Sequence, residues 1–163
     1  MPEGRLVTFE SAAFPNVFLR LDGTGVTART GPGAGQVNCQ FGAKEWEVFR
    51  IVRQPNDVIT IESLAFPGVY LRMDGTVVTA PVGPGGGTVN CQFGAYEWEQ
   101  FRLEPKGEGF FAIASVAFPG VYLRMDGNGV TAPTGPGGGT VNCQFGAGAW
   151  ERFRVATVPG KAK

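Results

Sequence analysis

The sequence predicts an all-β chain made of three nearly identical units that close into a threefold ring. Three observations support this prediction. A residue pattern returns every 52 residues, short runs alternate apolar with polar residues, and glycine and proline are abundant, at 26 and 12 of 163 residues. Alternating runs separated by glycine-rich turns are typical of antiparallel strands. We therefore expect short strands joined by tight turns along the whole chain.

The repeat is marked by aromatic and cysteine residues that keep one spacing. The marker triplets are Phe14, Phe66 and Phe118; Cys39, Cys91 and Cys143; Trp46, Trp98 and Trp150. The register divides the chain into units of about 5–56, 57–108 and 109–160. Propellers usually need at least four blades, and open solenoids need polar capping units, whereas the terminal units here keep the apolar positions of the middle one. We expect one β-trefoil domain over residues 1–163, with pseudo-threefold symmetry.

Four strands are expected in each unit, and the second unit shows them most clearly. Their ranges there are 58–63, 69–73, 77–80 and 99–103. Alternation within these runs turns every second side chain toward a core. An Asp74–Gly75 pair after the second run favours a tight turn. The predicted core triplets are Val7, Ile59 and Phe111; Leu19, Leu71 and Leu123; Phe49, Phe101 and Phe153.

A glycine-rich segment, residues 83–88 in the second unit, leads into an alternating run. Val89, Cys91 and Phe93 form its apolar side, and Asn90 and Gln92 form its polar side. This loop and the run after it are among the most faithfully repeated parts of the three units. Core packing alone does not require such a uniform loop, so we expect the function to reside here.

The tryptophans are the first candidates for ligand contact. Trp46, Trp98 and Trp150 fall on the strand parity that points away from the core. An indole ring stacks on the C–H face of a pyranose and offers one N–H donor. The alternative is a structural lid folded over the flank of the barrel.

A glutamate follows each tryptophan: Glu47, Glu99 and Glu151. A carboxylate accepts two hydrogen bonds and can clamp neighbouring sugar hydroxyls while the ring stacks. An ion pair with an arginine of the same unit, such as Arg72 or Arg102, explains the glutamate equally well.

Amide side chains complete the candidate set. They are Asn38, Asn90, Asn142, Gln40, Gln92 and Gln144. An amide offers both donors and an acceptor, which suits hydroxyl recognition, but it can also satisfy the backbone of the glycine-rich loop. For the asparagines the structural role is favoured. The three cysteines cannot all pair with one another, and on the apolar side of a strand we expect them to be reduced and buried.

Charge and composition exclude several function classes. The 14 basic and 14 acidic residues balance, which argues against nucleic acid or an anionic membrane as a partner. The absence of histidine rules out His-dependent triads and His-ligated metals, and we expect no metal and no cofactor. No stretch is apolar enough to span a bilayer. Residues 1–5 do not resemble a signal peptide, although a secreted or cell-surface location is expected for a glucan binder.

Three runs of the second unit resemble the strand pattern of fascin-type trefoils. They are Val69–Tyr–Leu–Arg, Val78–Thr–Ala and Glu99–x–Phe–Arg–Leu. The loop with Val89–Asn–Cys–Gln–Phe–Gly–Ala and the Trp98–Glu99 pair is more similar to the trivalent carbohydrate-binding modules of family 92. The repeat resembles the β-trefoil superfamily over essentially the whole chain. The resemblance to family 92 implies binding of β-1,6- or β-1,3-linked glucan through the Trp–Glu pair of each unit. It also implies a polysaccharide or oligosaccharide partner and an attached or associated carbohydrate-active enzyme. The Gln-x-Trp signature of ricin-type lectins is absent, so galactose recognition is not implied.

Two other function classes remain open. One is a protein-interaction trefoil, such as a fascin-like actin-binding or inhibitory domain, for which three surface tryptophans have no evident use. The other is a glycosidase, but the Glu97 and Glu99 pair has no equivalent in the third unit, which carries Ala149. The sequence therefore predicts non-catalytic, trivalent sugar binding. Differences around the tryptophans, such as Arg29 in place of Pro81 and Pro133, predict three sites of unequal strength.

Overall fold

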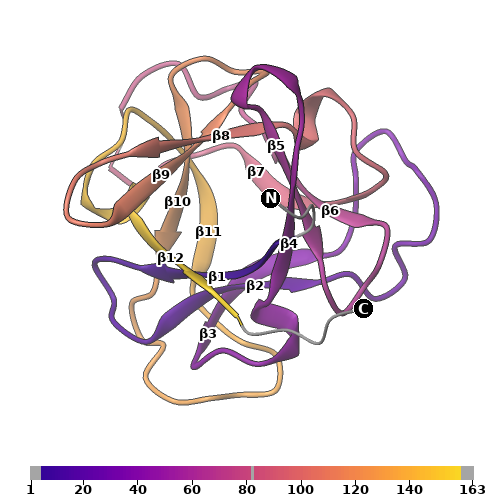
Figure 1. Cartoon of the computed structure of the whole chain (residues 1–163). Coiled ribbons are helices and arrows are strands. Elements are labelled where there is room, and N and C mark those ends of the chain that lie inside the picture. The colour runs from indigo at the N-terminus through magenta and orange to yellow at the C-terminus, as the bar shows by residue number, and fades with distance from the viewer. Residues whose placement is uncertain (1–4, 82, 159–163) are drawn as a thin grey trace.

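Twelve antiparallel strands form a β-trefoil over the described residues, 5–81 and 83–158, of a computed structural model (Figure 1). In chain order the strands are β1 (Arg5–Ser11), β2 (Val17–Asp22), β3 (Gln36–Phe41), β4 (Phe49–Arg53), β5 (Ile59–Ser63), β6 (Val69–Asp74), β7 (Thr88–Phe93), β8 (Phe101–Pro105), β9 (Phe110–Ser115), β10 (Val121–Asp126), β11 (Thr140–Phe145) and β12 (Phe153–Thr157). The fold class expected from the sequence is confirmed.

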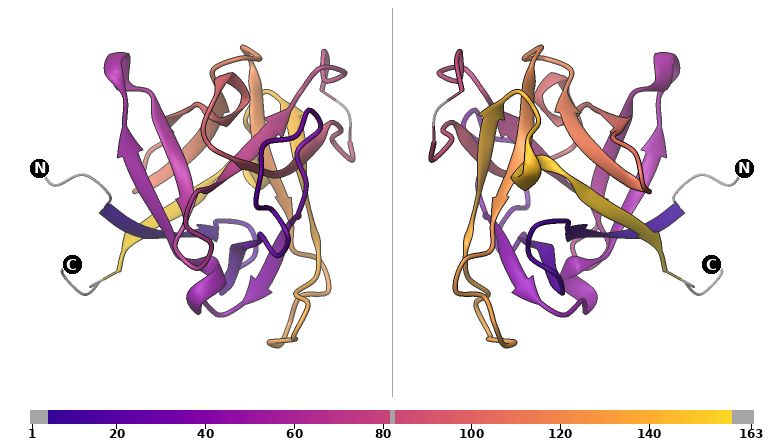
Figure 2. Two further views of the ribbon diagram at one scale, coloured as in Figure 1. Left: turned by 90° about the vertical axis from the view of Figure 1, so that its right-hand side faces the viewer. Right: turned by 90° about the vertical axis from the view of Figure 1, so that its left-hand side faces the viewer.

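Six of these strands close into a barrel. β1 pairs with β4, β4 with β5, β5 with β8, β8 with β9, β9 with β12, and β12 returns to β1. Closure leaves no unpaired barrel edge. The first and last strands of the chain are thereby neighbours, and Figure 2 shows the start of β1 and the end of β12 on one side of the molecule.

The other six strands form three hairpins that cover one end of the barrel. They are β2–β3, β6–β7 and β10–β11, and each pairs over six residues on either strand. Their second strands, β3, β7 and β11, contact one another. The loop before β11 lies on the opposite side of the molecule from the start of β1 (Figure 2). The hairpins therefore meet around the threefold axis, where the glycine-rich loops also arrive.

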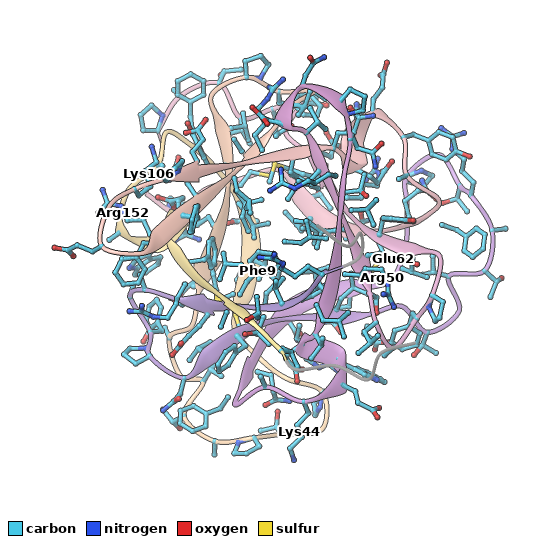
Figure 3. The ribbon with its side chains drawn as sticks, in the orientation of Figure 1. Phe9, Lys44, Arg50, Glu62, Lys106 and Arg152 are labelled. Carbon is cyan, nitrogen blue, oxygen red and sulfur yellow. The ribbon has the colours of Figure 1, made fainter. Side chains whose placement is uncertain are left out.

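The core fills the space between barrel and hairpins. Phe9 lies at its centre, fully buried, with its ring 5.7 Å from that of Phe49 (Figure 3). All predicted core residues are buried except Phe111, which is only partly buried. Phe111 stands at the open end of the barrel, where it lines a cavity of about 470 Å³ with Val7 and Ile59. It lies near the beginning of β9, so less of the barrel covers it.

The predicted third strand of each unit is wrong. Residues 77–80 form turns and bends, with Val77 75% exposed and Val78 buried. The Asp74 carboxylate accepts a hydrogen bond from the amide of Thr76, and the amide of Val78 bonds to the carbonyl of Gly75. The chain therefore curls after the turn instead of extending, and β7 pairs with β6 in its place. Phe93, expected on the apolar side of that run, is 39% exposed and lies against Gly68.

Short 3₁₀ helices precede the last strand of each unit. They are η1 (Glu45–Glu47), η3 (Glu97–Glu99) and η4 (Ala149–Glu151), and a further one, η2 (Pro55–Asp57), links β4 to β5. The fourth strand of the second unit thus begins at Phe101, two residues later than expected. Within the described ranges, no helix is long and apolar enough to cross a bilayer.

Each glycine-rich loop leaves its own unit and lies along a strand of the next. We call these segments the straps: residues 30–35, 83–87 and 134–139. Ala34 exchanges two backbone hydrogen bonds with Cys91, Gly86 exchanges two with Cys143, and Gly138 exchanges two with Cys39, at 2.8–2.9 Å. In Figure 1 the third strap can be followed beside β3. The straps therefore join the units in a cycle, and the third one closes the ring.

Polar side chains on the hairpins hold the straps in place. At the third strap, Asn38 donates to the carbonyl of Pro136 at 3.0 Å, and Gln40 donates to the carbonyl of Thr134 at 2.6 Å. The Gln40 side-chain oxygen accepts from the amide of Thr134 at 3.0 Å. Asn90 and Gln92 make the same bonds to the first strap, at Pro32 and Thr30, and Asn142 bonds to Pro84 of the second. These amides satisfy the backbone of the loops.

The cysteines lie where strap and strand meet. Cys39, Cys91 and Cys143 are fully buried and free, as expected. Burial raises the pKa of each thiol to about 12. These thiols therefore pack as small apolar groups and stay protonated.

A substitution at Gly137 tests how tightly the third strap packs on β3. A Cβ there would lie 2.5 Å from the carbonyl oxygen of Cys39, and its φ of +69° is unfavourable for other residues. We expect Gly137→Ala to lower the free energy of unfolding by at least about 2 kcal/mol in chemical denaturation. The control is Gly129→Ala, at φ +84° in open space, where backbone strain alone should cost about 1–2 kcal/mol. Equal losses in the two variants would contradict the tight strap contact.

Candidate functional site

Each tryptophan lies in the 3₁₀ helix of its unit and is half-buried. The guanidinium carbon of Arg72 lies 4.8 Å from the centroid of the Trp98 ring, and the ring of Phe118 lies edge-on at 5.1 Å. Trp46 has Arg20 and Phe66 at 4.8 and 5.1 Å. Trp150 has Arg124 and Phe14 at 4.7 and 5.2 Å. Because each phenylalanine comes from the next unit in the cycle, the tryptophan position depends on contacts between units.

Three buried arginines lie beneath the tryptophans. Arg72 on β6 donates to the Asn90 side-chain oxygen at 3.1 Å and to the carbonyl of Gly31 at 3.3 Å. Arg20 makes the same contacts with Asn38 and Gly135, and Arg124 makes them with Asn142 and Gly83. A buried guanidinium requires hydrogen-bonded partners. The arginine therefore joins strap, hairpin and tryptophan in one rigid group.

The glutamate after each tryptophan is buried as well. Glu99 accepts a hydrogen bond at Oε1 from the amide of Tyr96, at 2.6 Å, and Glu47 and Glu151 do the same with Lys44 and Gly148. Oε2 of Glu99 lies 3.9 Å from Nε of Arg72, and Oε2 of Glu151 lies 4.0 Å from Nε of Arg124. Both separations are longer than a hydrogen bond. Oε2 accepts no hydrogen bond within the described part of the chain, so it is the acceptor that this carboxylate offers to a ligand.

Burial raises the pKa of all three glutamates. Desolvation is the largest cause, and it is opposed by the backbone hydrogen bond and by the charge of the nearby arginine. For Glu47 that arginine is Arg20, which makes no ion pair within 4.0 Å with it in the described ranges. The carboxylates are thus held in a poorly solvated position, where a new hydrogen bond is worth more than at the surface.

The Trp46 site is a pocket of about 710 Å³ built from two units. Its floor consists of Arg20, Gln40, Trp46 and Glu47, and its far wall is the segment 133–135 at the start of the third strap. Lys44 lies at the outer edge of the molecule, at the rim of this pocket (Figure 3).

The Trp98 site repeats this arrangement in a smaller pocket of about 400 Å³. Arg72, Gln92, Trp98 and Glu99 form the floor, and Arg29 and Gly31 of the first unit form the far wall. Tyr96 stands where the Trp46 site has Lys44. The two pockets share no residue.

The Trp150 site has the same inner contacts and a different rim. Arg124, Trp150 and Glu151 keep the geometry given above, whereas Gly148 and Ala149 replace Tyr96 and Glu97. The rim of the third site therefore lacks long side chains on this side.

The structure brings some sequence candidates together and separates others. The tryptophan and glutamate of the first two units line one pocket each, together with Gln40 or Gln92. Asn38 and Asn90 lie behind the pockets and hold the straps. One side of each tryptophan packs on a phenylalanine and an arginine, as a lid would, and Trp46 and Trp98 each also line a pocket. Asp22, Asp74 and Asp126 hold turns, as in the bond from the Thr24 amide to Asp22.

Sequence reasoning missed two contributions to the site. The sequence suggests the buried arginines, such as Arg72, only as ion-pair partners, yet Arg20 and Arg72 form part of the floor of the first two pockets, and Arg124 lies 4.7 Å from the centroid of the Trp150 ring. An arginine that recurs within three otherwise apolar strands is the signal that could have identified them. The far wall comes from a neighbouring unit, and no pattern within one unit reveals that. No group of three metal-ligating side chains occurs among residues 5–81 and 83–158.

Comparison with known proteins supports the fold. No family model and no curated protein matches the chain. Solved structures do match, among them a mosquitocidal holotoxin at 9% identity and a TM-score of 0.72, over 97% of this chain and 18% of that one. The designed threefold-symmetric protein ThreeFoil matches at 11% identity and 0.70, over 94% and 99%. The ricin B-like lectin of Macrolepiota procera, solved in complex with lactose, matches at 14% and 0.66, over 96% and 97%. At these identities the matches establish the β-trefoil alone.

The raised pKa of Glu99 predicts a pH dependence of stability. The folded chain holds this proton more tightly than the unfolded chain, so the contribution of Glu99 to stability falls as pH rises from its ordinary pKa of 4.5 through the folded value. We expect the unfolding free energy of the wild type minus that of Glu99→Gln to decrease from about pH 4 to about pH 7. Glu97→Gln, on the same short helix, controls for the loss of one surface charge. A difference that stays flat or increases would contradict a desolvated Glu99.

Proposed function

We propose that the chain binds glucans without cleaving them, through one pocket per unit centred on Trp46, Trp98 and Trp150. The observation that carries this proposal is the group of tryptophan, buried arginine, buried glutamate and strap. This group lines a pocket in two units and keeps its inner geometry in the third. Strap docking accounts for the arginine and asparagine bonds, but it does not require a tryptophan beside a carboxylate oxygen that accepts no hydrogen bond from a described residue.

The chemistry of the pocket suits a sugar ring. The part of the indole ring that lines the pocket can stack on the C–H face of a pyranose, and the indole N–H can donate. Oε2 of the glutamate can accept from a hydroxyl. A second hydroxyl can bond at the strap wall to the carbonyl of Pro133 or to the amide of Gly135. Apolar stacking combined with convergent polar groups is the usual composition of small-ligand sites.

The choice of β-linked glucan rests on the resemblance to carbohydrate-binding modules of family 92. That resemblance implies β-1,6- and β-1,3-linked chains, recognised through the Trp–Glu pair of each unit. The Macrolepiota procera lectin, which has the same fold, was solved with lactose, but the Gln-x-Trp signature of ricin-type lectins is absent here. We further propose that an attached or associated carbohydrate-active enzyme profits from this anchoring.

The proposal predicts about three weak sites per chain for a short β-1,6-glucan oligosaccharide in calorimetric titration. Trp98→Ala should remove one site and leave two, since sites that share no residue act independently. Replacing all three tryptophans by alanine should abolish binding. Retention on an insoluble glucan should exceed the single-site affinity by roughly 10²-fold, because a second contact with the same strand is intramolecular.

The matched control is Phe110→Ala. Phe110 also carries a stacked arginine, Arg154 at 4.6 Å, but it lines neither pocket, so its loss should leave binding intact. Circular dichroism melting shows whether each variant is folded. A folded triple-tryptophan variant that still binds glucan would contradict the assignment, as would shortened oligosaccharides after incubation with the wild type.

A further inference from the structure

Two departures from the repeat meet at one place in the molecule. Arg29 in the first unit replaces the prolines at 81 and 133, and Tyr96 in the second unit replaces Lys44 and Gly148. The guanidinium carbon of Arg29 lies 3.9 Å from the centroid of the Tyr96 ring. Residues that break the pattern in different units thus form one stacked pair across the boundary between those units.

The pair is held from both sides. Arg29 directly precedes Thr30, whose amide and carbonyl both bond to the side chain of Gln92, at 3.0 and 2.6 Å. Tyr96 lies against Gly94, where a Cβ would come within 3.1 Å of the tyrosine ring. Backbone contacts therefore fix the start of each side chain, and stacking orients its end.

The pair faces the Trp98 pocket and is available to a ligand. Both residues line that pocket, and Tyr96 is 47% exposed. Arg29 is exposed and makes no ion pair with a described residue. Burial raises the pKa of Glu99, and the positive charge of Arg29 is one of the smaller effects that oppose this rise. Arg29 therefore acts on the electrostatics of the same pocket. Neither of the other sites has an aromatic residue or an arginine at these positions.

We propose that Arg29 and Tyr96 form a second sugar subsite beside Trp98, so that this site holds two adjacent glucose rings and is the strongest of the three. The inference rests on the proposed function. One ring stacks on Trp98, and the next receives hydrogen bonds from the planar guanidinium of Arg29 and meets the exposed part of Tyr96. Stacking restricts the arginine before binding, which reduces the entropy lost when it bonds to hydroxyls.

The other two sites offer less to a second ring. Lys44 at the Trp46 site carries a flexible ammonium group with a single charged centre, and it stacks on no aromatic ring of residues 5–81 and 83–158. The Trp150 site has Gly148, which contributes no side chain. We therefore expect the Trp98 site to distinguish one-ring from two-ring ligands more strongly than either of the others.

The test isolates one site and removes only the pair. The parent variant carries Trp46→Ala and Trp150→Ala, so only the Trp98 site remains. The loss variant adds Arg29→Pro and Tyr96→Gly, which are the residues that the repeat has at Pro81 and Gly148. The probes are methyl β-glucoside, which has one ring, and gentiobiose, which has two β-1,6-linked rings, with affinities from NMR titration. We expect gentiobiose binding to weaken about five- to tenfold, the range for one or two hydrogen bonds, and methyl β-glucoside binding to stay within about twofold.

A reverse variant transfers the pair to the third site. In a chain with Trp46→Ala and Trp98→Ala, Pro81→Arg with Gly148→Tyr should strengthen gentiobiose binding about five- to tenfold. The space for the new ring is open, because nothing lies within 4 Å of a Cβ at Gly146, the counterpart of Gly94. This variant keeps the inference testable if the first one fails to fold.

The possible results distinguish failure of the Arg29–Tyr96 subsite from failure of the proposed function. Unchanged gentiobiose affinity in a folded loss variant would overturn the subsite and leave the proposed function standing. Equal weakening of both ligands would also overturn it, since the pair would then only shape the pocket. Failure of the parent Trp98-only chain and of the wild type to bind any glucan would overturn the proposed function, and the subsite with it.

Discussion

The docking of each strap onto the strand of the next unit is the contact on which the rest of this structure depends. It consists of two backbone hydrogen bonds at a buried cysteine, reinforced by side-chain bonds from an arginine, an asparagine and a glutamine. The third strap, on β3, returns the chain to its first unit and so complements the pairing of β1 with β12. The same contact supplies the far wall of each described pocket, so ring closure and site formation share one set of residues.

This arrangement explains why charged groups are buried in so small a fold. A buried arginine and glutamate lose hydration that their mutual attraction only partly restores. In the Trp98 site that loss is limited by bonds from Arg72 to Asn90 and Gly31 and from Tyr96 to Glu99, and Oε2 of Glu99 accepts no hydrogen bond from the residues that the structure describes. A preorganised acceptor in a poorly solvated pocket costs stability and favours a ligand that supplies the missing donor. The raised pKa of Glu99 is a sign of this cost.

The sequence predicted much of the fold because the repeat and the alternation are local. The threefold ring and the buried cysteines could be predicted from spacing and parity. The strand at 77–80 was wrong because the Asp74 side chain redirects the backbone, an effect that alternation does not report. The burial of Glu99, the role of Arg72 and the wall at 29–31 depend on how one unit lies on another. A pattern read within a single unit carries no information about that docking.

The central claim is that one sugar site is shared between two units, with a tryptophan from one and a strap from its neighbour. A crystal structure of the protein with a β-1,6-linked glucose trisaccharide tests it most directly. We expect a sugar ring on Trp98 with hydroxyls bonded to Glu99 and to the segment 29–31, and an equivalent ring between Trp46 and the segment 133–135. A sugar bound elsewhere, for example at the barrel opening lined by Val7, Ile59 and Phe111, with both tryptophan pockets empty, would contradict it.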